Sequence, residues 1–292
     1  GSLAILIPID KLGKLYLGQL DLESAEKEFR RAREAGHAPT TVNPMIARAL
    51  LGQREFQRVL DELPAPLDSG PDATTLLALR ATAALALGHK EDARKTLLQA
   101  QQATPDNAEV HLALAQLALA DGDIDKAMQA LDQALSIDPG HRDSLLLKGD
   151  LLRATGKLDQ AAAAYREVLK IDPQHVNARL ALAGIAIAEN RLDDARREVD
   201  TALKVMPSNL QARYTQALID FREKKTERAR DRLATVLKSA PNYIPALLLG
   251  GSIEYILGNL QTAEAHLNKV VKATPNNVYA LRLLAASQLR LG

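Results

Sequence analysis

This chain of 292 residues has no cysteine and no tryptophan, and aromatic residues make up only 3% of it. The lack of cysteine excludes disulfides, thiolate metal ligands and a cysteine nucleophile. Because aromatic side chains are scarce while apolar residues reach 47%, the core is expected to be aliphatic, built from alanine and leucine. No apolar run is long enough to form a membrane-spanning helix, so no direct membrane insertion is expected.

An excess of charge of either sign is also missing. Lys and Arg number 37 and Asp and Glu number 36, which leaves a net charge of +1. Such a chain has no general attraction for nucleic acids or anionic membranes, so we expect neither as a partner. Phosphate-binding glycine loops and paired-histidine zinc motifs are absent from the sequence, and we read His141 and His175 as solvated loop residues. The sequence therefore predicts no catalytic residue, no metal and no cofactor.

What the sequence does contain is a repeat of 34 residues. Counting Arg142 as position 1, a frame stepped by this period in both directions never needs an insertion or a deletion. Position 8 is glycine or alanine in every unit, and position 20 is alanine except for Val59. Position 24 is a larger apolar or aromatic residue, and position 32 is proline from Pro71 onwards. The chain is therefore an array of similar units.

Each unit is predicted to be two helices joined by a tight turn. In residues 142–175, apolar residues recur three and four apart on both sides of a break at Gly156. Small residues at positions 8 and 20 let the two helices approach closely, and the proline at position 32 ends the second helix. One hairpin cannot bury both of its faces, so neighbouring hairpins must stack. We expect an all-α superhelical solenoid of about seventeen helices.

This pattern resembles the tetratricopeptide repeat, or TPR. The resemblance implies a right-handed superhelix, and it covers residues 6–292. Its units are 6–39, 40–73, 74–107, 108–141, 142–175, 176–209, 210–243, 244–277 and a partial unit, 278–292. Residues 1–5 lie outside the array, and Gly1 and Ser2 look like the remnant of a cleaved expression tag.

The ends of the array and its second unit depart from the regular pattern. Pro8 is expected to open a first helix at about 9–18, with residues 3–7 folding back on the end of the array. Pro64 and Pro66 should shorten the second helix of repeat 2, which makes 63–70 the expected flexible joint. The last helix, 278–291, is apolar where arrays normally end in a polar helix. We therefore expect a piece of a longer repeat protein, with self-association through this edge.

First-helix positions 2, 5, 9, 12 and 13 line the concave groove that receives partner peptides in the TPR family. In repeats 7 to 9 these positions are aromatic and apolar with an arginine rim, and the predicted partner site there is Tyr214, Leu218, Phe221, Arg222, Tyr255, Tyr279 and Arg282. In repeats 3 to 6 they are smaller or acidic, and include Glu109, Leu112, Gln116, Asp143, Leu146 and Asp150. The lysine and asparagine set that grips a C-terminal carboxylate in some TPR domains is absent.

Two alternatives to this partner site remain open. Some of the aromatic residues can instead pack between helices. A charged convex face in repeat 7, which has eight basic and four acidic residues, can instead steer a partner. The simpler interpretation is that these charged side chains are only solvated and bind no partner.

The resemblance implies a non-catalytic scaffold for protein–protein interaction. Residues 241–251 and 275–286 resemble the long TPR lipoproteins of the bacterial PEP-CTERM/exosortase system. That family is encoded with exopolysaccharide biosynthesis and export genes, which implies a periplasmic scaffold anchored to the outer membrane. The alternative is the regulatory or substrate-binding TPR region of a larger enzyme, such as a glycosyltransferase. The sequence leaves the partner and the compartment open, the cytoplasm included.

Overall fold

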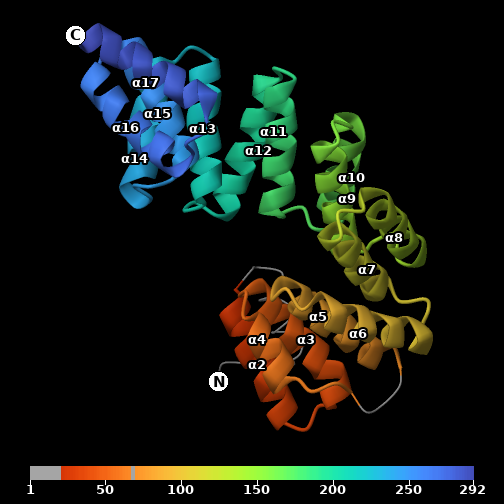
Figure 1. Cartoon of the computed structure of the whole chain (residues 1–292). Helices are drawn as coiled ribbons and strands as arrows, with labels where there is room; N and C mark the ends of the chain where they lie inside the picture. The colour runs from red at the N-terminus through yellow and green to blue at the C-terminus, as the bar shows by residue number, and fades with distance from the viewer. Residues whose placement is uncertain (1–20, 67–69) are drawn as a thin grey trace, which may run out of the picture. The chain divides into compact units, whose positions relative to one another are not determined.

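The computed structural model describes residues 21–66 and 70–292. Over these residues the chain forms sixteen α-helices, α2 to α17, and no strand (Figure 1). The predicted all-α fold is therefore confirmed. The helix expected at 9–18, the folding back of 3–7 and part of the expected joint at 63–70 lie outside the described residues.

The helices alternate between the first and second members of successive hairpins. The first helices are α3 (Pro39–Gly52), α5 (Pro71–Ala86), α7 (Ala108–Ala120), α9 (Arg142–Ala154), α11 (Val176–Ala188), α13 (Leu210–Arg222), α15 (Ile244–Leu257) and α17 (Val278–Leu291). The second helices are α2 (Leu22–Glu34), α4 (Phe56–Glu62), α6 (Lys90–Ala103), α8 (Ile124–Ile137), α10 (Leu158–Ile171), α12 (Leu192–Val205), α14 (Thr226–Ser239) and α16 (Leu260–Ala273).

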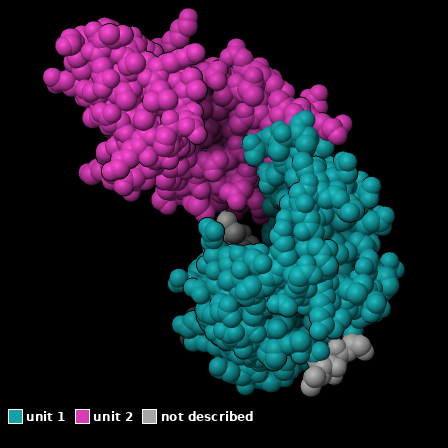
Figure 2. All heavy atoms as spheres, viewed as in Figure 1, with its two compact units in different colours: residues 1–155 teal, residues 156–292 magenta. Residues whose placement is uncertain are grey.

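The chain divides into two compact units, residues 1–155 (unit 1) and 156–292 (unit 2), which are coloured separately in Figure 2. In unit 1, α6 and α8 each contact the first helix of their own hairpin and that of the next. In unit 2, α12, α14 and α16 do the same. First helices also contact one another in order, as α3, α5 and α7 do in unit 1 and α11, α13, α15 and α17 do in unit 2. Each unit therefore has a layer of first helices and a layer of second helices.

The small residues lie where the two layers meet. Ala81, Ala115 and Ala217 at position 8 and Ala93 and Ala195 at position 20 are all buried. At Gly251, also in position 8, an added Cβ would lie 2.6 Å from Cγ of Leu267 at position 24. The expected role of these positions in close helix packing is confirmed.

The turns inside the hairpins use a left-handed backbone conformation at position 15. Glycine occupies most of these turns, for example Gly88 and Gly258, both with φ of 83°. Arg54, Asn190 and Lys224 occupy three others, with φ of 64°, 57° and 62°. Arginine and lysine have no local hydrogen bond that favours this conformation, so the turns of repeats 2 and 7 have the same geometry with less favourable residues.

Repeat 2 has the shortened second helix that its prolines predicted. Helix α4 has 7 residues, against 14 in α6, and ends at Glu62. Leu63 leaves the helical conformation with φ −118° and ψ 83°, because proline at the following position disfavours a helical backbone. Val59, the large residue at position 20, is nevertheless fully buried.

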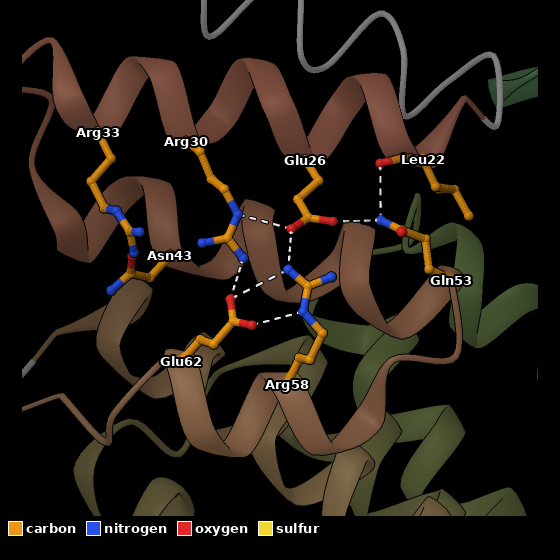
Figure 3. Close-up of polar contacts among 8 residues, drawn as sticks. All are labelled: Leu22, Glu26, Arg30, Arg33, Asn43, Gln53, Arg58 and Glu62. Atoms are coloured by element: carbon orange, nitrogen blue, oxygen red, sulfur yellow. Dashed lines mark hydrogen bonds and ion pairs between the residues drawn. The ribbon is translucent and has the colours of Figure 1, made fainter.

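A ring of four charged side chains joins the short α4 to α2 (Figure 3). Carboxylates and guanidinium groups alternate around the ring, which runs from Glu26 and Arg30 on α2 to Glu62 and Arg58 on α4, at N–O distances of 2.5 to 2.8 Å. Burial alone would raise the pKa of Glu26, but hydrogen bonds from Gln53, Arg58 and Arg30 outweigh it and lower that pKa. These contacts connect the short α4 to α2.

Candidate functional site

Three of the predicted partner-site residues pack partly against the core of unit 2. Tyr214, Leu218 and Phe221 are half-buried and pack against the cluster that contains Leu233 and Ile253. The ring of Tyr214 meets that of Tyr243 edge-on, with centroids 5.6 Å apart, and burial raises its pKa. For these residues the alternative of packing between helices is the better description.

Two other predicted residues make contacts that cross from α15 to α17. The hydroxyl of Tyr279, whose residue is 57% exposed, lies 3.1 Å from that of Ser252. The guanidinium carbon of Arg290 lies 5.0 Å from the ring centre of Tyr255, which is a cation–π distance. Position 13 in the family groove would have revealed Arg290, which the sequence analysis did not include. We call the exposed first-helix surface of α13, α15 and α17 the unit 2 face.

The remaining predicted residues, Arg222 on α13 and Arg282 on α17, are exposed. Helix α15 lies between α13 and α17 in the contact order (Figure 1). Tyr255 and Tyr279 thus lie on neighbouring helices, whereas the ring of Tyr214 packs against that of Tyr243. The partner site itself remains a prediction.

Unit 1 contains a groove that the sequence analysis did not single out. It has a volume of about 570 Å³ and is lined by first-helix residues of α3, α5, α7 and α9 together with Leu22 of α2. Leu51, Leu79, Leu112 and Leu146 supply its apolar surface. The six residues named above for repeats 3 to 6 line it: Glu109, Leu112, Gln116, Asp143, Leu146 and Asp150. Four others at these family positions, Arg153, Asn177, Leu180 and Ile187, do not line it.

Glu109 is the buried charge of this unit 1 groove. It is 6% exposed, its carboxylate lies 2.5 Å from Arg48 Nη2 and 3.5 Å from His141 Nε2, and the contact with Arg48 joins repeats 2 and 4. Burial opposes ionisation, yet the hydrogen bond from His141 and the charge of Arg48 hold the pKa of Glu109 below its usual range. The expectation of a solvated His141 was wrong, because the ring packs between this carboxylate and Ser144 Oγ, 2.8 Å from Nδ1.

Four of the eight basic residues of repeat 7, Lys225, Arg228, Arg230 and Arg232, form ion pairs within the described residues. Asp220 of α13 is fully buried, and its carboxylate lies 2.9 Å from Arg196 Nη2, 3.3 Å from Arg228 Nε and 2.6 Å from Arg232 Nε. Glu223 adds a contact to Lys225 at 2.7 Å. These ion pairs tie α12, α13 and α14 together, so half of this charge has a structural role.

Neither a metal site nor a membrane-spanning helix is found in the part of the chain that the structure describes. No group of three or more His, Cys, Asp or Glu side chains is placed to hold a metal ion there. Among the same residues, every helix is too short or too polar to cross a bilayer.

Stacked helical hairpins with residues gathered along their first helices define a repeat scaffold of the kind that binds other proteins. Family models described as tetratricopeptide repeat match residues 79–142, 152–219 and 214–278. The chain therefore belongs to the tetratricopeptide repeat superfamily. No curated protein matches the sequence, and the finer resemblance to the PEP-CTERM-system lipoproteins is not confirmed.

Several solved structures share this fold at low sequence identity. A chain of the APC/C hetero-tetramer Cut9-Hcn1 aligns with TM-score 0.79 and 15% identity over 96% of this chain, which spans only 54% of that chain. PilW, a type IV pilus biogenesis factor, aligns with TM-score 0.63 and 19% identity over 72% of this chain and 98% of its own. YrrB, a TPR protein with an unusual peptide-binding site, aligns with TM-score 0.50 and 17% identity over 64% of this chain and 96% of its own. At these identities the likeness shows the fold.

Proposed function

We propose that this chain is a non-catalytic scaffold that binds partner polypeptides on the unit 2 face. The observation that supports the proposal is the pair of contacts between α15 and α17, which presents Tyr255, Tyr279 and Arg290 together at the surface. Tyrosine and arginine are the residues that most often anchor protein interfaces. The half-buried Tyr214, Leu218 and Phe221 would form the floor of this site, with Arg222 and Arg282 at its rim.

The proposed setting is a bacterial envelope complex for exopolysaccharide production and export or for protein sorting. It is supported by the resemblance of residues 241–251 and 275–286 to the PEP-CTERM-system lipoproteins, and PilW is an envelope precedent for the same fold. In this proposal the protein is periplasmic and anchored to the outer membrane in its full-length form. Detection of the protein in outer-membrane fractions of the source cells, rather than in the cytosol, would test this setting.

The binding role is tested with paired alanine variants and affinity capture. Because Tyr214 packs on Tyr243, we choose Tyr255 and Tyr279, whose contacts connect α15 and α17. Tyr255→Ala with Tyr279→Ala should weaken binding of a captured partner by ~2 kcal/mol or more, with unchanged helical circular dichroism.

The matched control is Thr82→Ala with Gln116→Ala, which removes a side-chain hydrogen bond of 2.8 Å in the unit 1 groove. It should leave the affinity within a factor of a few. Loss of binding in the control but not in the tyrosine variant would move the site to the unit 1 groove and contradict the proposal.

A further inference from the structure

The first helices of the unit 2 face carry almost no acidic residues. Helices α13, α15 and α17 contain only Asp220 and Glu254. Asp220 is fully buried against its arginines, and Glu254 is 9% exposed and accepts a hydrogen bond of 2.6 Å from Asn259 Nδ2. These helices therefore place no exposed carboxylate on the face.

Arginines, by contrast, reach the same surface without an acidic neighbour. Within the described residues, no ion pair engages Arg222, Arg282 or Arg290, and the nearby Glu223 pairs with Arg196 and Lys225. Arg290 lies over Tyr255. Arg282 follows Tyr279 by three residues, close to one helical turn, which puts the two on the same side of α17.

The unit 2 face also has exposed apolar side chains. Ile256 on α15 is 59% exposed and Leu289 on α17 is 84% exposed. A face of this composition can offer charge-assisted hydrogen bonds to carboxylates and apolar contact within the same few turns of helix.

From this charge pattern we infer that the unit 2 face binds an acidic segment of polypeptide that also carries an apolar or aromatic side chain. The inference rests on the proposed function and specifies the partner's chemistry. Arginine guanidinium groups bind carboxylates in a bidentate manner, and the exposed Ile256 and Leu289 provide the contact for the apolar side chain. The unit 1 groove is lined by Arg48 and Arg142 as well as by Glu109, Asp143 and Asp150, so it has no excess of positive charge to attract the same segment, and the two surfaces differ in selectivity.

The inference is tested by calorimetric titration of the intact chain with three synthetic peptides of equal length. Each contains phenylalanine flanked by glutamate in the first peptide, by glutamine in the second and by lysine in the third. We expect the glutamate peptide to bind at least ~10-fold more tightly than the glutamine peptide at low ionic strength, and the difference to shrink as salt screens the charges. The lysine peptide should bind most weakly.

Variants locate the effect on the face. Arg282→Gln with Arg290→Gln should remove most of the preference for glutamate, measured as the ratio of the affinities of the glutamate and glutamine peptides for the same variant. Lys238→Gln with Lys272→Gln removes the same net charge from exposed positions on α14 and α16 and should leave the preference intact. Because all four residues are exposed, folding should survive in both variants, which circular dichroism checks.

The other possible results distinguish a failure of this inference from a failure of the proposed function. Equal binding of the glutamate and glutamine peptides, both weakened by the Tyr255 and Tyr279 changes, overturns the acidic preference and leaves the binding role standing. No binding of the glutamate peptide, or tighter binding of a single-stranded oligonucleotide, also overturns the inference. If in addition the tyrosine changes leave a captured partner's affinity unaltered, the proposed function fails as well.

Discussion

Glu109 shows how one residue can hold two repeats together. Its carboxylate stays ionised with little access to water because Arg48 of repeat 2 and His141 at the end of its own repeat approach it. Removing one member of a buried ion pair leaves the other without compensation. Arg48 retains partial contact with water, so the cost of losing Glu109 is smaller than for a fully buried pair.

We expect Glu109→Gln to lower the free energy of unfolding at pH 7 by about 2 kcal/mol. Since the folded-state pKa of Glu109 is lowered, its stabilisation is present above the unfolded-state pKa of about 4.3 and is lost as the pH falls through the folded-state value. The difference between wild type and variant, measured by urea denaturation, should therefore shrink below about pH 4. Glu91→Gln, at an 87% exposed side chain, is the control. A difference that stays constant down to pH 3 would mean that the ion pair is not its source.

Within one helix, a glycine is required only where a neighbouring element comes close. Gly251 on α15 faces Leu267 of α16, which is fully buried, and a Cβ there would lie within 2.6 Å of it. Gly184 on α11 has no side-chain or distant atom within 4 Å of an added Cβ. The two residues have similar helical surroundings and differ in what packs against them.

Alanine at these two sites should therefore have opposite effects. Gly184→Ala should raise the free energy of unfolding by about 0.5–1 kcal/mol, because alanine favours helix over glycine. Gly251→Ala should lower it by about 1–3 kcal/mol, because overpacking outweighs the same helix preference. Thermal and urea denaturation measure both. Stabilisation by both substitutions would mean that Leu267 moves aside without cost.

At the scale of the whole molecule, the last helix presents apolar side chains to solvent. Val278 of α17 is 58% exposed and Leu281 is 40% exposed, and their spacing of three residues puts them on one side of the helix. In α15, Leu247 occupies the position of Leu281 and is 1% exposed, because α16 and α17 pack around it. An exposed apolar stripe of this kind favours association, and we propose that a second copy of the chain covers it.

Sedimentation velocity over a range of protein concentrations tests this proposal. We expect the chain to self-associate at high concentration, and Val278→Glu with Leu281→Glu to weaken association by ~10-fold or more, since charges at both positions must be desolvated in the interface. Ile171→Glu, at a 49% exposed site on α10, should have no effect. A chain that remains monomeric at the highest concentration contradicts the proposal.

The sequence by itself determined the features that repeat. Small residues at positions 8 and 20, the left-handed turns near position 15 and the proline at position 32 act over a few residues or within one hairpin, so a fixed period reveals them. The same periodicity placed Glu109, Gln116 and Asp150 on a common surface before the structure showed the unit 1 groove.

Only the tertiary structure decided which side chains meet across hairpins. Arg48 and Glu109 are 61 residues apart and Arg196 and Asp220 are 24 apart, so no local pattern joins them. Tyr214 was predicted to face a partner but is held by Tyr243, whereas Arg290, which the sequence analysis did not include, lies over Tyr255. Period and local propensity set where each helix begins and ends, but the exposure of a side chain depends on the size and charge of its neighbours on other helices. Those neighbours are not repeated from unit to unit, and for that reason the candidate site could be placed on the first helices by sequence but its accessible residues could not.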